Sequence, residues 1–284
     1  MIFSSASAQS DTANWPSQNL NIKNSRYSTL DQINTSNVDQ LNILWSFEPG
    51  LRDDIAQVTP LVVDGVMYLH SRATMYALDA TTGEELWRRI LDSGPANGPV
   101  RGSTYAEGRV YAYRGADLYA FDAETGAAVA SFGDAGFLKV VAQGLHHQYP
   151  DTYPTDIDPI TIGYRLTTPP TFHDGIIYVA AALSEGHIPG GLVIAIDATT
   201  GAIQWVFNTI PQTPRDSGWE LAQESWGTGA RAGGGVWTPP AIDAQLRMVY
   251  VNAGNPSPDY DGSARVGANL FSNSTIAIDM DTGK

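Results

Sequence analysis

The sequence contains no cysteine among its 284 residues, which excludes a disulfide framework, a zinc–thiolate site and a thiol nucleophile. Basic residues are also few, since 16 Lys and Arg stand against 30 Asp and Glu, for a formal net charge of −14. Because such a surface repels phosphate backbones and anionic lipids, nucleic acid is not an expected partner. No stretch approaches about 18 uninterrupted apolar residues, so no segment is expected to span a bilayer.

Glycine, proline and aromatic residues are plentiful, with 28 Gly, 17 Pro and an aromatic content of 10%. These residues are typical of many short strands joined by tight turns, and they interrupt long helices. The hydrophobic content of 43% supplies enough apolar material for a large core. We therefore expect an all-β protein.

The first residues form a Ser- and Ala-rich stretch in which Ala6-Ser7-Ala8 is typical of a signal-peptidase site. Neither a basic segment nor a full apolar segment precedes it, as a complete signal peptide would require. We expect residues 1–14 to be either a disordered terminus or the remnant of a signal peptide, and residues 15–284 to form the folded domain.

A short motif recurs along the chain. The copies are YALDATTGEELW at 76–87, YAFDAETGAAVA at 119–130, IAIDATTGAIQW at 194–205 and IAIDMDTGK at 276–284. Each predicts a strand that ends at an Asp, a turn closed by Thr-Gly, and a second strand with Trp eight residues after the Asp. Trp87 and Trp205 fit this pattern, whereas Ala130 departs from it. Trp45 lies 42 residues before Trp87, a spacing typical of one four-stranded blade of a β-propeller.

A second repeated unit supplies the other two strands of each blade, as a strand, a polar turn and an alternating strand. Its copies are TPLVVDGVMYLH at 59–70, STYAEGRVYAYR at 103–114, TPPTFHDGIIYVAA at 168–181 and TPPAIDAQLRMVYVNA at 238–253. The motif aspartates are spaced by 43, then 75, then 82 residues, so the later blades carry insertions of roughly 30 to 40 residues. About four blades are present, and we expect the chain to be the N-terminal part of a larger propeller, with a natural short form as the alternative.

The chain resembles the pyrroloquinoline quinone (PQQ)-dependent alcohol and sugar dehydrogenases. The segments that carry the resemblance are NSRYSTLDQINTSNVDQLNILWSF at 24–47 and GGGVWTPPAIDAQLRMVYVNAGNPSPDYDGSARVGANLFSNSTIAIDMDTG at 233–283. The resemblance implies an eight-bladed β-propeller with a tryptophan-docking motif in each blade, of which about four blades are present here. It also implies a periplasmic location.

The resemblance assigns residues to the cofactor. A flat quinone with three carboxylates needs an aromatic floor, cations or hydrogen-bond donors at its edge, and a metal that polarises its reactive carbonyl. The matching cofactor-binding positions are Trp237, which stacks under the ring, Arg101, Thr167, Gln57 and, in the glycine run before the tryptophan, Gly235. Gln57 stands where many members have a glutamate.

Two further positions match the metal ligands of the family, the carboxylate of Glu185 and the amide oxygen of Asn255. Calcium takes six to eight oxygen ligands, and a carboxylate, an amide carbonyl and cofactor oxygens form a plausible set. Calcium is therefore the expected metal, with a lanthanide as the alternative. The loop around Glu185 departs from the usual family pattern.

The implied reaction is oxidation of an alcohol or sugar to the carbonyl, with electrons passed to a cytochrome c or a membrane quinone. The catalytic base of the family is an aspartate in a segment expected beyond Lys284, and neither Asp259 nor Asp261 is assigned to that role. We expect the remaining C-terminal blades to be needed to close the propeller, and this chain alone to be inactive. The alternative function is a non-catalytic propeller scaffold of the outer-membrane protein assembly type, since fold alone does not fix function.

Overall fold

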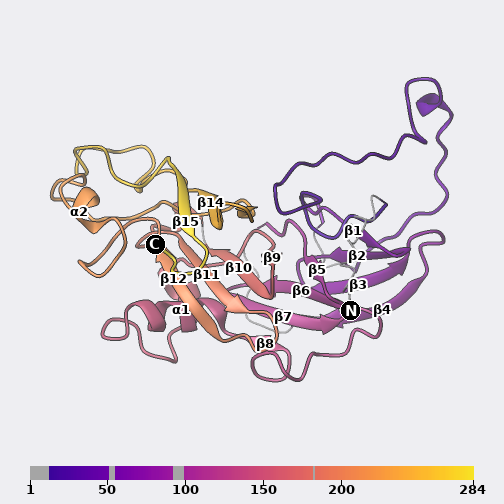
Figure 1. Ribbon diagram of the computed structural model, residues 1–284, viewed down its shortest axis with the longest axis horizontal. Coiled ribbons are helices and arrows are strands. Elements are labelled where there is room, and N and C mark those ends of the chain that lie inside the picture. The colour runs from indigo at the N-terminus through magenta and orange to yellow at the C-terminus, as the bar shows by residue number, and fades with distance from the viewer. Residues whose placement is uncertain (1–12, 51–54, 92–98, 182) are drawn as a thin grey trace, which may run out of the picture.

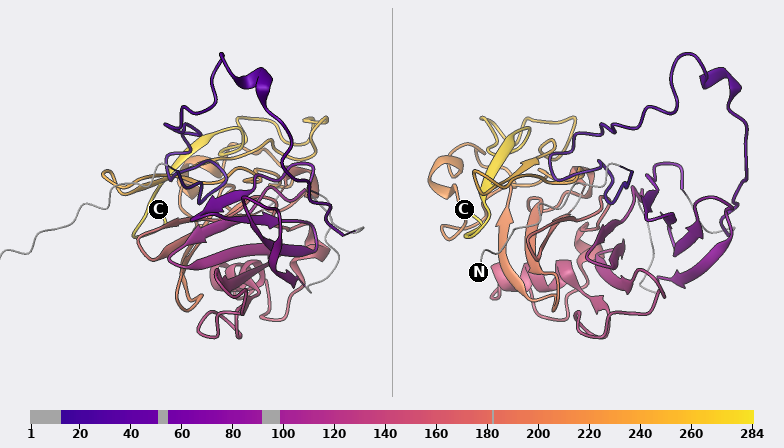
Figure 2. Two further views of the ribbon diagram at one scale, coloured as in Figure 1. Left: turned by 90° about the vertical axis from the view of Figure 1, so that its right-hand side faces the viewer. Right: turned by 45° about the vertical axis from the view of Figure 1, so that its right-hand side comes forward.

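The computed structural model describes residues 13–50, 55–91, 99–181 and 183–284. The expected terminus or signal-peptide remnant, residues 1–14, lies almost wholly outside the described residues. Four antiparallel sheets follow one another in chain order, and Figures 1 and 2 show them arranged around an arc. This confirms the prediction of an all-β fold with about four propeller blades.

The first two blades are four-stranded. The strands of blade 1 are β1 (Leu61–Val63), β2 (Val66–His70), β3 (Thr74–Asp79) and β4 (Glu85–Ile90), and those of blade 2 are β5 (Thr104–Ala106), β6 (Arg109–Arg114), β7 (Asp117–Asp122) and β8 (Phe137–Leu138). In each blade every strand pairs with the next along the chain, as the repeated sequence units predict.

The third and fourth blades follow the same order and carry the long insertions. Blade 3 consists of β9 (Thr171–His173), β10 (Ile176–Ala181), β11 (Leu192–Asp197) and β12 (Ile203–Asn208), and blade 4 consists of β13 (Ala241–Asp243), β14 (Met248–Asn252) and β15 (Thr275–Asp279). The helices α1 (Val140–Gln148) and α2 (Trp219–Ala222) and the 3-10 helices η2 (Pro159–Ile162) and η3 (Ser184–Gly186) lie between strands, and the 3-10 helix η1 (Val38–Gln40) precedes β1. Among the described residues no helix is long and apolar enough to cross a bilayer.

Hydrophobic clusters fill the spaces between neighbouring sheets. One cluster joins blades 1 and 2, a larger one joins blades 2 and 3 and includes α1, and a third joins blades 3 and 4. Blades 2 and 3 each lie between two neighbouring sheets and bury both faces, so their central strands carry apolar residues at consecutive positions. All six residues of β10 except the first are buried.

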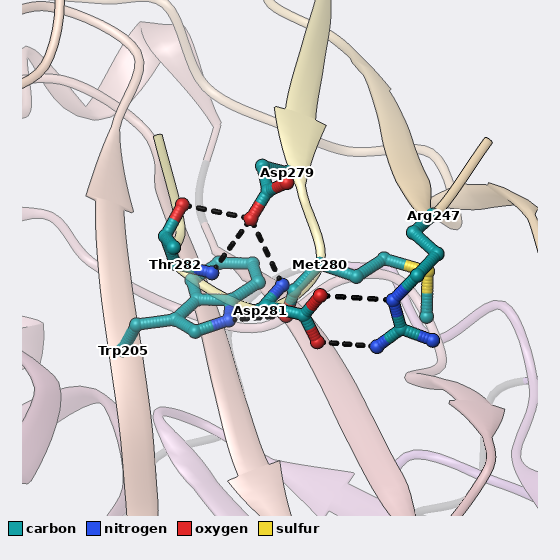
Figure 3. A network of polar contacts seen from close by, with 6 residues as sticks. All are labelled: Trp205, Arg247, Asp279, Met280, Asp281 and Thr282. Carbon is teal, nitrogen blue, oxygen red and sulfur yellow. Dashed lines mark hydrogen bonds and ion pairs between the residues drawn. The ribbon is translucent and has the colours of Figure 1, made fainter.

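The recurring Asp-x-x-Thr-Gly segment forms a tight turn held by its own aspartate. The Oδ1 atom of Asp279 accepts hydrogen bonds from the backbone N–H groups of Asp281 and Thr282 and from the Thr282 hydroxyl. Figure 3 shows this turn. Asp197 makes the same contacts with Thr199 and Thr200. This geometry explains why the motif needs Asp at its start and Thr three residues later.

Each motif tryptophan joins its own blade to the next one. The Trp87 indole N–H, from β4, donates to Ala123 O at 2.9 Å, just after β7. The Trp205 indole N–H, from β12, donates to Met280 O at 2.8 Å, just after β15 (Figure 3). Trp45, which lies before blade 1, donates in the same way to Ala80 O at 3.2 Å. The tryptophan repeat is therefore a connection between neighbouring blades.

At Ala130, where the motif lacks its tryptophan, other side chains make the contact with the next blade. The carbonyl of Ala198, equivalent to those of Ala123 and Met280, accepts hydrogen bonds from the Tyr111 hydroxyl at 3.0 Å and from Arg109 Nη1 at 2.8 Å. The fully buried Phe132 packs edge-on against Tyr111. The tyrosine contact is shared between blades, since the Tyr68 hydroxyl donates to Ala123 O at 3.2 Å in the same way. Arg109 therefore supplies the donor that an indole supplies elsewhere.

The first strands of neighbouring blades lie side by side. β1 contacts β5 and β5 contacts β9, and the Thr171 hydroxyl of β9 donates to Pro240 O at 2.8 Å, just before β13. The N-terminal segment runs across them, since Trp15 pairs with Val62 and Ile242 N donates to Ile22 O at 2.7 Å. Segments that lead into these four strands therefore converge.

Candidate cofactor and metal site

Four of the residues predicted to bind the cofactor occupy equivalent places in the four blades. Gln57, Thr167 and Trp237 each stand four residues before the first strand of a blade, and Arg101 stands three residues before β5. Because the first strands of adjacent blades are neighbours, their lead-in segments come together from distant parts of the sequence. The predicted residues therefore lie on the converging segments that lead into the first strands of the four blades.

Three of these residues form one contact group. Arg101 Nη1 donates to Thr167 O at 2.9 Å, and Arg101 Cζ lies 5.4 Å from the centroid of the Trp237 ring. Trp237 is 46% exposed, so one part of the indole remains open beside the guanidinium. The structure therefore joins a half-open aromatic surface to a cation, as a planar anionic ligand would require.

The electrostatic setting of Arg101 favours an anion. Burial lowers the pKa of its guanidinium, the nearby Tyr113 hydroxyl opposes this shift, and no carboxylate among the described residues contributes to it. The Arg101 backbone N–H donates to the Tyr113 oxygen at 3.0 Å, which fixes the main chain. A partly buried guanidinium without an acidic partner is suited to bind a carboxylate or a quinone oxygen.

Buried hydroxyl groups lie in the same lead-in segments. The side-chain oxygens of Thr167, Thr168 and Ser103 are buried and have no hydrogen-bond partner among the described residues. Buried polar groups are nearly always hydrogen-bonded, so several orphaned hydroxyls in neighbouring segments indicate a missing ligand or water. Thr167 was predicted from the sequence, whereas Thr168 and Ser103 were not.

Glycines bring the chain segments around Trp237 into close contact. The Gly235 N–H donates to Ser184 Oγ at 3.0 Å, and the Gly254 N–H donates to Gly235 O at 2.9 Å. A Cβ atom at Gly254 would lie 2.7 Å from Ser184 Oγ and 3.7 Å from Trp237 Nε1. Gly233 likewise lies against the backbone of Asn255, where a Cβ would meet its carbonyl oxygen at 2.5 Å. The glycine run thus packs against the two segments that carry the predicted metal ligands.

Glu185 and Asn255 stand on adjoining backbone segments. Ser184 precedes Glu185, and its oxygens accept hydrogen bonds from the Gly235 N–H and from the Ser257 hydroxyl, the latter at 2.6 Å. Gly254, which contacts Ser184, directly precedes Asn255. The Glu185 side chain is exposed and that of Asn255 is partly buried. Their main chains are therefore held side by side next to Trp237.

The side chain of Asn255 is oriented by its own neighbours. Its Nδ2 donates to Asp259 Oδ1 at 2.7 Å and to Pro256 O at 3.3 Å. Both partners are acceptors, so the amide oxygen faces away from them. That oxygen is the atom that a hard cation would bind. Asp259 is a contact that the sequence analysis did not assign, because its position four residues after Asn255 carries no motif.

The metal site would need ligands beyond these two residues. In the part of the chain that the structure describes, no three His, Cys, Asp or Glu side chains gather as a metal-binding group. Glu185 and Asn255 supply oxygen donors, which suit a hard cation, and oxygens of a bound cofactor would have to add to the set. The donor chemistry fits calcium or a lanthanide and does not fit zinc or copper.

Gln57 lies apart from the contact group. Its side chain is exposed, and no contact with Arg101, Thr167 or Trp237 links it to them among the described residues. Its backbone is two residues from Thr59, whose N–H donates to Arg101 O at 3.0 Å. Gln57 therefore stands at the edge of the site.

Comparison with known proteins identifies relatives of the whole chain. Residues 15–284 match the family described as "PQQ: Glucose/ethanol/alcohol dehydrogenase, beta-propeller domain". The quinohemoprotein alcohol dehydrogenase ADH-IIG of Pseudomonas putida is 31% identical over 297 aligned positions, which cover 98% of this chain and 38% of the relative. The chain therefore spans well under half the length of this relative.

Solved structures share the fold at similar identity. The quinohemoprotein alcohol dehydrogenase of Comamonas testosteroni superposes with a TM-score of 0.78 at 28% identity, over 95% of this chain and 40% of that structure. A europium-containing methanol dehydrogenase superposes with a TM-score of 0.77 at 27% identity, over 97% of this chain and 48% of that structure. Both matches cover nearly all of the blades described here.

Proposed function

Because the chain belongs to the PQQ-dependent glucose, ethanol and alcohol dehydrogenase β-propeller family, we propose that it forms the cofactor-binding part of a dehydrogenase that oxidises an alcohol or a sugar to the carbonyl. The observation that carries this proposal is the contact of Arg101 with both Thr167 and Trp237. These residues come from three different blades, and together they offer an aromatic surface and a cation, the groups that bind a planar anionic ligand.

The residues of the chain have distinct tasks in this proposal. When bound, PQQ supplies the two-electron oxidant for the substrate. Trp237 provides the aromatic floor, Arg101 binds a carboxylate or quinone oxygen, and the buried hydroxyl of Thr167 satisfies a further cofactor oxygen. Gln57 contributes a neutral amide at the rim, and Gly235 keeps the segment before Trp237 packed against Ser184.

We propose that Glu185 and Asn255 hold a metal ion beside the cofactor, where it would act as a Lewis acid on the reactive carbonyl. Calcium is the proposed metal because an acid and an amide supply few charges, which suits a divalent ion. A lanthanide is the second candidate, since a solved structure with the same fold contains europium.

We further propose that turnover needs chain beyond the four blades, because the matched relatives are more than twice as long. The docking of Trp45 supports this: its segment stands where the fourth strand of a preceding blade would stand, as β4 and β12 do for their neighbours. The additional blades would close the ring and supply the catalytic aspartate, so residues 1–284 alone should not turn over. A cytochrome c or a membrane quinone is the proposed electron acceptor, and the periplasm the proposed location.

The test uses the full gene product, titrated with PQQ and Ca²⁺ while Trp fluorescence and dye reduction with alcohols and sugars are followed. We expect saturable quenching and metal-dependent turnover, with quenching strongly reduced in Trp237→Ala and metal dependence lost in Asn255→Ala. Trp226→Phe is the matched control, since that indole is fully buried and bonded to Leu270 O. If the folded protein ignores PQQ at every metal concentration, the dehydrogenase proposal fails and the scaffold function takes its place.

A further inference from the structure

The side-chain amide of Asn255 has a hydrogen-bonded nitrogen, whereas its oxygen is left without a donor among the described residues. Its nitrogen donates to Asp259 Oδ1 at 2.7 Å and to Pro256 O at 3.3 Å, and its side-chain oxygen accepts no hydrogen bond from the described residues. A flipped amide would place that oxygen against a carboxylate and a carbonyl, which repel it. The atom of the Asn255 amide that can accept a new partner is therefore its oxygen.

The backbone of Asn255 is also fixed. The Gly234 N–H donates to Asn255 O at 2.8 Å, and Gly233 pairs with Pro256 in an antiparallel bridge. With the main chain held, the remaining freedom of Asn255 lies in the rotation of its side chain. The bond to Asp259 removes that freedom, because a charged acceptor holds a donor more strongly than a neutral one.

Building on the proposed metal site, we propose that Asp259 is a positioning residue for the metal. It clamps the nitrogen of Asn255 so that the amide oxygen is presented to the ion, and its carboxylate adds a negative charge close to the site without binding the ion itself. Ligand-orienting partners of this kind commonly contribute tenfold or more to metal affinity.

The two contributions can be separated by two substitutions. Asp259→Asn keeps the size and an oxygen acceptor and removes the charge, whereas Asp259→Ala removes both. The attraction between the carboxylate and the metal ion scales with the charge of the ion. Loss of the carboxylate should therefore weaken the binding of a trivalent ion more than the binding of a divalent one. A purely structural role for Asp259 would not discriminate between ions by their charge.

The experiment measures Ca²⁺ and La³⁺ affinity of the full gene product at saturating PQQ by calorimetric titration. We expect Asp259→Asn to lose roughly tenfold in Ca²⁺ affinity and more in La³⁺ affinity, and Asp259→Ala to lose more than Asp259→Asn for both ions. Asp261→Asn is the matched control, since Asp261 is a nearby exposed acid whose carboxylate accepts from the Ser263 N–H instead. The control should stay within about twofold, because its charge is solvent-screened.

The outcomes distinguish this inference from the proposed function. If Asn255→Ala abolishes metal binding while both Asp259 variants bind like the unmodified protein, the metal site stands and the role of Asp259 is wrong. Equal loss for Ca²⁺ and La³⁺ in Asp259→Asn contradicts the charge contribution. If the unmodified protein binds PQQ but neither ion, the proposed metal site itself fails. Thermal melts of all variants identify any loss of metal affinity that comes from unfolding. If Asp259→Ala is destabilised, the near-isosteric Asp259→Asn decides the role of Asp259.

Discussion

At the scale of single residues, the site depends on polar groups of Arg101 and Thr167 that the described residues only partly supply with hydrogen-bond partners. Arg101 donates one hydrogen bond to the Thr167 carbonyl and faces the Trp237 ring. The Thr167 hydroxyl is buried and has no hydrogen-bond partner among the described residues. Both groups gain interaction energy when an anion arrives, because hydrogen bonds to charged groups are among the stronger ones in proteins.

We predict that Arg101→Lys weakens PQQ binding by roughly tenfold while leaving the fold intact, since an ammonium keeps the charge and loses the planar contact with Trp237. Arg101→Ala should weaken it further. Fluorescence titration of the full gene product measures both. Arg88→Lys is the control, because Arg88 is an exposed arginine paired with Glu85. Unchanged PQQ affinity in Arg101→Ala would remove Arg101 from the site.

A second residue-scale prediction concerns the turn aspartates. Hydrogen bonds from Thr200 and Thr199 hold the pKa of Asp197 below its ordinary value of 3.8. A carboxyl whose pKa is lowered by folding contributes stability that is complete above the unfolded value and is lost as the pH falls through the folded value. Asp197→Asn should therefore show a smaller drop in urea midpoint between pH 7 and pH 3 than the unmodified chain. An identical drop would show that Asp197 is not part of the acid response.

At the scale of elements, the tryptophan-to-turn contact is the unit that joins blades, and glycine is part of it. At Gly126, where φ is +67°, a Cβ would lie 2.6 Å from the Trp87 ring. At Gly108, where φ is +75°, a Cβ would meet nothing within 4 Å. The two positions share the left-handed backbone and differ in the docked indole.

We predict that Gly108→Ala lowers the free energy of unfolding by about 1 kcal/mol, the cost of a left-handed non-glycine residue. Gly126→Ala should cost about 1–3 kcal/mol more, because the methyl group must displace the indole. Urea unfolding of both variants gives the difference. Equal costs would mean that the indole adapts without loss and that docking does not depend on a close fit.

The elements were largely predictable from the sequence because the repeats fix strand, turn and strand at constant spacing. The substitution at Ala130 was visible as a departure, yet the replacement of the indole donor by Arg109 was not, since Arg109 lies in a different strand. Resemblance to a family supplied Trp237, Arg101 and Thr167 as candidates. Ser184 was not predicted because its contacts with Gly235 and Ser257 join segments distant in sequence. Asp259 was not predicted because its position four residues after Asn255 carries no motif.

At the scale of the whole molecule, the four blades form an arc, and the segments that lead into their first strands come together because those strands are neighbours. The docking of Trp45 on the first turn repeats the relation between consecutive blades, as the proposed closure by further blades requires. The contact group of Arg101, Thr167 and Trp237 comes from the segments that lead into blades 2, 3 and 4. The proposed cofactor contacts therefore lie within the chain, and closure and the catalytic base are proposed to come from further blades.

The most direct test of the central claim is a structure of the full gene product with PQQ and Ca²⁺ bound. We predict that the quinone stacks on the exposed face of Trp237, that Arg101 and Thr167 contact its oxygens, and that the ion is bound by Glu185 and the side-chain oxygen of Asn255. PQQ bound elsewhere, or a cofactor that leaves the Trp237 face open, would contradict the account.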